Sequence, residues 1–258
     1  YYELKGLSFR EYLSLKGVAD VPACSLEDLL ENHVKFAKAL KPHHMLVQFS
    51  DYLQTGYYPF FIEGTQDYIG KVNNIIEKVL YEDITVACNV KQQSIPALKR
   101  LLHLVATAKS FIPNVERMSE RMGVSRQQVY DYIEYLARAG LLHTLYPDAK
   151  GLKLVRKPGK IFMENTNFLV AMCGTLKLDG DVGNLREVFF ANQLSKDYRC
   201  NIHDQGDFIV DGKTVFEVGG ASKDFHQIKD NQDAYLAVDG VEVGFGRKIP
   251  LYLFGFLY

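Results

Sequence analysis

Apolar residues recur at helical spacing through the first part of the chain. Ser8 precedes the first such run, and Ser25 precedes a second whose broad apolar face continues to Leu40. Serine is favoured just before a helix, because its hydroxyl oxygen accepts a hydrogen bond from a backbone N–H of the first turn. We therefore predict a mostly helical segment over residues 1–96, with a further helix from Asp67 to Tyr81.

The next segment, residues 97–160, has a more specific pattern. It opens with an amphipathic helical run, and a short helix over 115–122 then ends at a glycine. Ser125 precedes a second helix, and two β-rich runs around a loop follow, the later one over 150–155. Helix, tight turn, capped helix and hairpin in this order are typical of a winged helix-turn-helix domain.

Residues 161–258 alternate predicted strands and helices, which indicates an α/β domain. Asp211-Gly212 stands between two β-rich runs, and this dipeptide strongly favours a hairpin turn. We also expect a helix around 222–232 and strands at AYLAV and PLYLFGF, so that the chain ends in a strand. The fold class expected for the whole chain is mixed α/β and multidomain.

The composition is that of a globular protein. Of 258 residues, 47% are hydrophobic and 24% are charged, and the formal net charge is −1. Four widely spaced cysteines predict buried thiols in a reducing compartment, and no apolar run has membrane-spanning length. We therefore expect a cytoplasmic protein with no membrane partner. Because the chain opens without methionine, natural residues are expected to precede Tyr1.

Charge is distributed unevenly along the chain. Residues 1–96 carry 9 basic and 12 acidic side chains, a net charge of −3. Residues 97–160 carry 12 basic and 5 acidic side chains, a net charge of +7. Residues 161–258 carry 9 basic and 14 acidic side chains, a net charge of −5. The basic middle segment makes duplex DNA a candidate partner, because lysine and arginine neutralise phosphates. The candidate base-reading and phosphate-binding residues are Arg126, Gln127, Gln128, Lys150, Lys153, Arg156 and Lys157.

Two acidic residues of the same predicted helix, Asp131 and Glu134, argue against DNA contact. The alternative is a structural linker whose basic face touches an acidic neighbouring domain.

Three acidic residues in the last segment suggest a divalent cation site. Glu187 lies on a predicted helix, whereas Asp207 and Glu217 lie on the two strands of the predicted hairpin. Carboxylates so arranged bind hard cations, which activate water in metal-dependent nucleases. Such nucleases also need a lysine two residues after the strand glutamate, and Gly219 stands there instead.

The missing lysine leaves three interpretations open. In the first, Lys223 or Lys229 reaches back to supply the charge, and in the second the acids bind a cation without cutting DNA. A Gly219→Lys substitution would restore the spacing and so test the site. Otherwise the acids are structural: Asp207 begins a strand, and the Glu217 carboxylate accepts hydrogen bonds from the backbone at Gly219-Gly220.

Several motifs together carry a family resemblance. The helix glutamate, GDFIVD and FEV resemble the PD-(D/E)XK restriction-endonuclease-like fold. LSFREYL, YLQTGYYP, the helix-turn-helix segment, KIFMENTNFL, NLREVFFANQL and GDFIVDGKTVFEV, in that order, resemble a family of prokaryotic AAA-type ATPases. The C-terminal half of those proteins is a domain of unknown function with this endonuclease-like ending.

The resemblance implies an N-terminal ATPase core that holds ATP and magnesium, as a partner of this chain. No stretch here matches the P-loop pattern GxxxxGK[ST], so no residue of this chain is assigned to ATP, and no cofactor is expected beyond a divalent cation. The leading hypothesis is a non-catalytic C-terminal module that recognises a partner or DNA, and self-association is a further partner expectation. The alternatives are a metal-dependent nuclease with a relocated lysine and a free-standing winged-helix transcription regulator.

Overall fold

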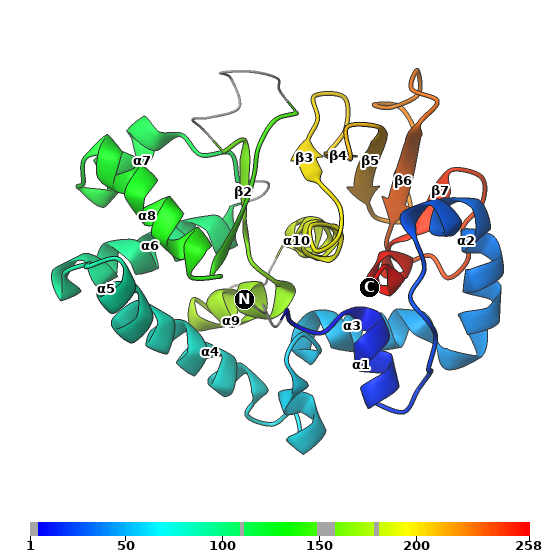
Figure 1. Ribbon diagram of the computed structural model, residues 1–258, viewed down its shortest axis with the longest axis horizontal. Coiled ribbons are helices and arrows are strands. Elements are labelled where there is room, and N and C mark those ends of the chain that lie inside the picture. Colours follow the sequence, from blue (N-terminus) through cyan, green and yellow to red (C-terminus); the bar gives the residue numbers. More distant parts are fainter. Residues whose placement is uncertain (1–4, 109–110, 149–157, 178–180) are drawn as a thin grey trace. The chain divides into compact units, whose positions relative to one another are not determined.

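The computed structural model describes residues 5–108, 111–148, 158–177 and 181–258 of a mixed α/β chain (Figure 1). The chain divides into two compact units. Tyr1–Tyr68 together with Phe189–Tyr258 form the first, here called the sheet unit, and Ile69–Val188 form the second, the helical unit. These units cut across the three segments expected from the sequence, because the first and last parts of the chain pack together.

Three α-helices lie in the first part of the sheet unit. The hydroxyl oxygen of Ser8 accepts from the Glu11 backbone N–H at 3.2 Å, and the Glu11 carboxylate accepts from the Ser8 backbone N–H at 2.8 Å. This reciprocal capping box confirms the predicted helix start, and Ser25 caps the second helix as expected. The three helices are α1 (Phe9–Leu15), α2 (Leu26–Leu40) and α3 (Met45–Thr55).

A five-stranded sheet forms the second part of this unit, with its strands in sequence order. The first three strands pair antiparallel, and the last three pair parallel. Asp211 and Gly212 have φ values of 53° and 68°, which confirms the predicted hairpin turn. The strands are β3 (Cys200–Ile202), β4 (Phe208–Val210), β5 (Thr214–Gly219), β6 (Ala234–Val238) and β7 (Lys248–Pro250).

Two predictions for the end of the chain are wrong. Residues 222–232 form turns, not a helix, because the Asp224 and Asn231 side chains accept from backbone N–H groups two residues later and so compete with helical bonding. The tail Leu251–Phe256 is a buried 3₁₀ helix, not a strand. It contacts α1, α3 and β7, so its side chains must face protein in several directions.

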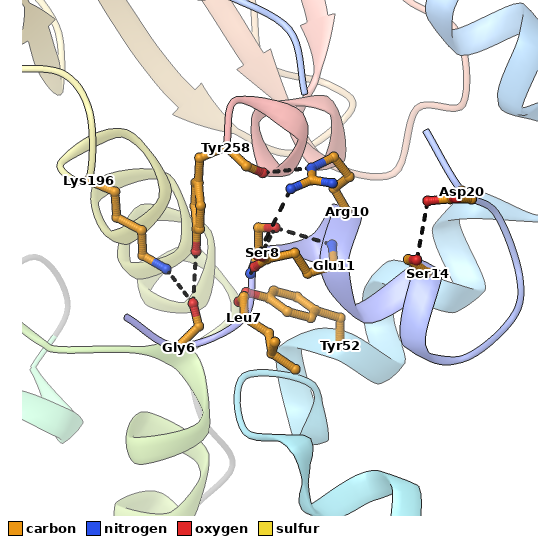
Figure 2. Close-up of polar contacts among 10 residues, drawn as sticks. All are labelled: Gly6, Leu7, Ser8, Arg10, Glu11, Ser14, Asp20, Tyr52, Lys196 and Tyr258. Atoms are coloured by element: carbon orange, nitrogen blue, oxygen red, sulfur yellow. Dashed lines mark hydrogen bonds and ion pairs between the residues drawn. The ribbon is translucent and has the colours of Figure 1, made fainter. Parts of the chain in front are cut away.

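Polar contacts join the two chain segments of the sheet unit (Figure 2). The Arg10 Nε donates to the Tyr258 carbonyl oxygen at 2.8 Å. The Lys196 Nζ and the Tyr258 hydroxyl both donate to the Gly6 carbonyl oxygen, at 2.9 and 3.1 Å. In the same unit, the Phe190 ring packs against the rings of Phe208, Phe216 and Phe254. The fold thus brings the last strands and the first helix into one core.

The helical unit contains the middle part of the chain. Its predicted amphipathic helix is confirmed, with Pro96 in the first turn and four buried leucine or valine side chains. The helices are α4 (Tyr68–Lys78), a π-helical turn at Val79–Asp83, α5 (Ile84–Ala87), α6 (Ile95–Thr107), α7 (Val115–Met122), α8 (Arg126–Arg138) and α9 (Thr166–Thr175). Helix α10 (Val182–Leu194) begins in this unit and ends in the sheet unit.

A two-stranded antiparallel sheet follows α8. Strand β1 (Leu142–Leu145) pairs with β2 (Lys160–Met163), with Leu142 opposite Met163. The strand predicted over 150–155 lies outside the described residues, and the observed partner of β1 is a strand that we expected in the last segment. The predicted boundary after residue 160 therefore falls inside this hairpin.

Candidate functional site

The strand β5 carries the most deeply buried acidic side chain of the candidate site. Glu217 is 3% exposed. Because side chains alternate along a strand, Glu217 shares a sheet face with Val215 and Gly219, whereas Phe216 faces the aromatic core. Ile228 from the turn segment packs with Val215 on the Glu217 face. A carboxylate in this position needs a partner, because an unpaired buried charge is strongly destabilising.

That partner is Lys223. Its Nζ forms an ion pair with Glu217 Oε1 and also donates to Gln227 Oε1 at 3.1 Å. The Lys223 side chain is 32% exposed, so it lies between the buried carboxylate and solvent. Of the two lysines that the sequence suggested, Lys223 therefore contacts Glu217, whereas Lys229 is exposed.

Asp207 lies beside the same glutamate. Its Oδ2 accepts from the Val218 backbone N–H at 2.9 Å, and its own backbone N–H donates to the Phe216 carbonyl oxygen at 2.9 Å. These two bonds reach the residues on either side of Glu217. Two carboxylates and one ammonium group are thus gathered where β4 begins and β5 ends.

Gly219 leaves the space that Lys223 occupies. A methyl group on Gly219 would lie 2.9 Å from Lys223 Cγ and 3.0 Å from its Cβ. Contacts this short require one of the two residues to move. The expected Gly219→Lys substitution would therefore not simply add a charge, because a lysine stem already fills the position.

Glu187 belongs to the helical unit. Its Oε2 lies 3.0 Å from Lys160 Nζ in β2, and the side chains are 14% and 13% exposed, respectively. Within the described part of the chain, no group of three or more His, Cys, Asp or Glu side chains is arranged to hold a metal ion. The structure thus brings together Asp207, Glu217 and Lys223, and gives Glu187 a lysine partner of its own.

The candidate DNA-reading residues lie in the first turn of α8. Gly123 adopts a left-handed conformation with φ 67°, which turns the chain between α7 and α8. Arg126, Gln127 and Gln128 are all exposed. The Gln128 Oε1 accepts from the Ser125 backbone N–H at 2.9 Å, so this glutamine completes a capping box.

Acidic neighbours hold the other two side chains of that turn. Arg126 forms an ion pair with Glu116 of α7, and both side chains are about two-thirds exposed, at 66% and 63%. The Gln127 Nε2 donates to Asp131 Oδ1 at 2.8 Å. The remaining basic candidates lie outside the described residues: Lys150, Lys153, Arg156 and Lys157.

The exposed side of α8 borders an open groove of about 610 Å³. The wall from β1 and the residues after it includes Thr144 and Tyr146, and the α8 wall includes Tyr130, Glu134 and Arg138. Glu134 and Arg138 lie one helical turn apart, with a 3.9 Å separation between their charged groups. Among the described residues that line it, the groove therefore has mixed charge.

The sequence did not indicate an apolar cavity of about 240 Å³ in the sheet unit. Leu29 and Phe36 of α2, the residues around Cys24, and Leu253 and Phe256 of the C-terminal helix line it. Its residues come from two distant parts of the chain, residues 21–43 and the C-terminal helix, so no local pattern predicts it.

All four cysteines are free thiols, as expected, but only Cys173 and Cys200 are buried, whereas Cys24 and Cys88 are partly exposed. Burial raises the pKa of Cys24 to about 11 and that of Cys200 to about 12. Both thiols are therefore protonated near neutral pH and are weak nucleophiles. No helix in the described ranges combines the length and the apolar character that crossing a membrane requires.

Fold and sites together define a mixed α/β protein in which the first turn of α8 is exposed and a buried glutamate at the end of β5 is paired with a partly exposed lysine. The chain belongs to the family of the domain of unknown function DUF8612, whose model matches residues 46–179, just over half of the chain. That match covers most of the helical unit.

A curated relative is the uncharacterized protein MJ1637 of Methanocaldococcus jannaschii. It is 24% identical over 263 residues, which cover 94% of this chain. The chain spans only 56% of the length of that relative. No solved structure matches the chain at a significant level.

Proposed function

We propose that this chain is the recognition module of an AAA-type ATPase and that it contacts duplex DNA through a winged helix-turn-helix in the helical unit. The observation that carries the proposal is the exposed first turn of α8, with Arg126 and Gln127 facing solvent after a tight turn. The first turn of a recognition helix is where helix-turn-helix proteins meet base edges. The paired strands β1 and β2 follow α8 in the chain, as a wing follows the recognition helix in such a domain, and this order supports the proposal.

DNA binding must compete with contacts inside the protein. Arg126 is already paired with Glu116, and Gln127 with Asp131. A phosphate would replace the Glu116 carboxylate as the partner of Arg126. We therefore expect weak binding that depends mainly on phosphate contacts and falls steeply with salt.

Fluorescence anisotropy with labelled duplexes tests this proposal. Replacing Arg126 and Lys153 together with alanine is expected to lower affinity about tenfold for every sequence and to reduce the salt dependence. The matched control is Arg138→Ala, which removes an equally exposed arginine from the last turn of the same helix. Absence of binding at low salt, or equal losses in the double variant and the control, contradicts the DNA role.

The ATPase partnership rests on the ordered motifs, and the greater length of the relative is compatible with it. A P-loop encoded upstream in the intact gene is the expected finding, and its absence favours the transcription-regulator alternative. This chain alone is expected to bind no MgATP in calorimetry. Micromolar affinity would contradict that expectation.

A metal-dependent nuclease is the second candidate, and one specific observation favours it. The Lys223 ammonium lies on Glu217 beside Asp207, so the charge missing at Gly219 is supplied by a residue four positions later. In a nuclease this ammonium would stand beside the attacking water. Manganese- or magnesium-dependent cutting of DNA that Lys223→Met abolishes, and Lys229→Met leaves intact, would support it. No cutting by the unaltered chain, or cutting that survives Lys223→Met, would contradict it.

A further inference from the structure

The position of Lys223 depends on the tight turn that follows β5. The strand ends at Gly219, and the Lys223 backbone N–H donates to the Gly220 carbonyl oxygen at 2.9 Å. The Lys223 side chain then folds back over Gly219 to reach Glu217. A small rotation of this turn would carry the ammonium group away from the carboxylate.

A second lysine, from the edge strand β7, holds the turn. Lys248 Nζ donates to the Ala221 carbonyl oxygen at 2.5 Å and to the Lys223 carbonyl oxygen at 3.2 Å. The strand β7 pairs with β6, and Lys248 lies opposite Leu236 in that ladder. The ammonium group therefore ties the turn after β5 to the far edge of the sheet.

Ordinary packing does not account for this contact. Ala221 is exposed, and Lys248 contacts the turn through the Ala221 backbone carbonyl oxygen. A charged donor forms a stronger and shorter hydrogen bond than a neutral one, so it fixes the carbonyl in place. With two of its three N–H groups on carbonyl oxygens, Lys248 acts through the backbone of the turn.

We propose that Lys248 is a positioning residue, which fixes the turn after β5 and so holds the Lys223 ammonium on Glu217. Gly219 is the second requirement, because any side chain there would displace the Lys223 stem. A catalytic role for this arrangement rests on the nuclease candidate proposed above. The effect of Lys248 on the position of Lys223 does not depend on that candidate.

Acetylation of individual lysines, measured by mass spectrometry after brief exposure to acetic anhydride, tests the position directly. In the unaltered chain Lys223 is expected to react slowly, because its ammonium is paired with Glu217. Lys248→Met should raise the reactivity of Lys223 about tenfold, because the variant removes the charge-assisted hydrogen bonds that hold the turn. Lys248→Arg keeps charged donors and should restore slow reaction. Lys229→Met, in the same turn segment, should leave Lys223 unchanged.

Lys16 serves as the internal reporter for general loosening. It lies in the sheet unit, is paired with Asp51 at 3.1 Å, and has a side chain 34% exposed, close to the 32% of Lys223. A local effect raises the reactivity of Lys223 and leaves Lys16 unchanged. Equal rises at both lysines, or no rise at Lys223, overturn the inference.

Gly219→Ala gives an independent arm that leaves Lys248 in place. The added methyl group should displace Lys223 and raise its reactivity by a similar factor. Unchanged reactivity in this variant would contradict the second requirement. If both variants respond as expected while the chain cuts no DNA, the positioning role stands and the nuclease candidate fails.

Discussion

Two ion pairs, one chosen from each unit, differ in burial. In the sheet unit, the Glu217 side chain is 5% exposed and Lys223 covers it. In the helical unit, Arg126 and Glu116 are 66% and 63% exposed. Removing one partner of a buried pair leaves an uncompensated charge, whereas an exposed pair contributes little to stability because water and salt replace it.

This difference separates two functional roles. A buried pair holds one arrangement of side chains, which a site that positions charge requires. An exposed pair can exchange one partner for another at little cost, which a surface that meets phosphates requires. The predictions below test that distinction, and hydrogen exchange measured peptide by peptide reports stability separately for each unit.

The largest effect is expected for Lys223→Met. This variant leaves the Glu217 carboxylate buried without its ammonium partner, so the free energy of opening of β5 and β6 should fall by about 3 kcal/mol. Peptides from α7 and α8 should exchange as before. Adding Glu217→Gln in the same chain should recover part of the loss, because the buried charge is then removed. If the free energy of opening falls by less than about 0.5 kcal/mol, this pair contributes no more to stability than an exposed ion pair does, and the distinction fails.

Gly219→Lys is expected to have the next largest effect. The new side chain competes with the Lys223 stem for one space, so the same peptides should lose about 2 kcal/mol. We also expect no gain of metal-dependent cutting, since the two lysines cannot both reach Glu217. Stability equal to the unaltered chain, or new cutting, would show that Lys223 moves aside freely.

Local patterns in the sequence predicted the parts of the fold that local chemistry decides. Ser8 and Ser125 cap helices, and Asp211-Gly212 forms the hairpin turn, because each depends on residues a few positions apart. The helix expected over 222–232 was wrong, and of the strand expected at PLYLFGF (250–256) only Pro250 lies in a strand, since side-chain bonds and burial decide those segments.

The same limit applies to the candidate site. Sequence spacing indicated Asp207 and Glu217, because both lie on one predicted hairpin. It offered Lys223 only as one of two lysines, and it gave no indication of Lys248. The bond from Lys248 to Ala221 joins residues 27 positions apart on separate elements, so no periodicity reports it. Contacts of this kind depend on the parallel order of β5, β6 and β7.

A smaller effect is expected for Ser125→Ala in the helical unit. The variant removes the hydroxyl oxygen that accepts from the Gln128 backbone N–H at 3.2 Å, so the α8 peptides should lose about 1 kcal/mol. Peptides from the sheet unit should not change. DNA affinity should fall as well, because the start of α8 presents Arg126. A matched serine control is Ser119→Ala in α7, which lies outside this cap.

The smallest effect on stability is expected for Glu116→Gln, together with a gain in DNA binding. The pair with Arg126 is exposed, so hydrogen exchange in α7 and α8 should change by less than about 0.5 kcal/mol. The variant frees the arginine and removes a negative charge from the proposed DNA face, so affinity for duplex DNA should rise about threefold at low salt. Glu120→Gln, on the same helix and also exposed, removes an equal charge without touching Arg126. A larger gain for Glu116→Gln than for Glu120→Gln would show that the pair itself competes with phosphate. Equal gains would reduce the effect to net charge, and no gain in either variant would count against α8 as the DNA-binding helix.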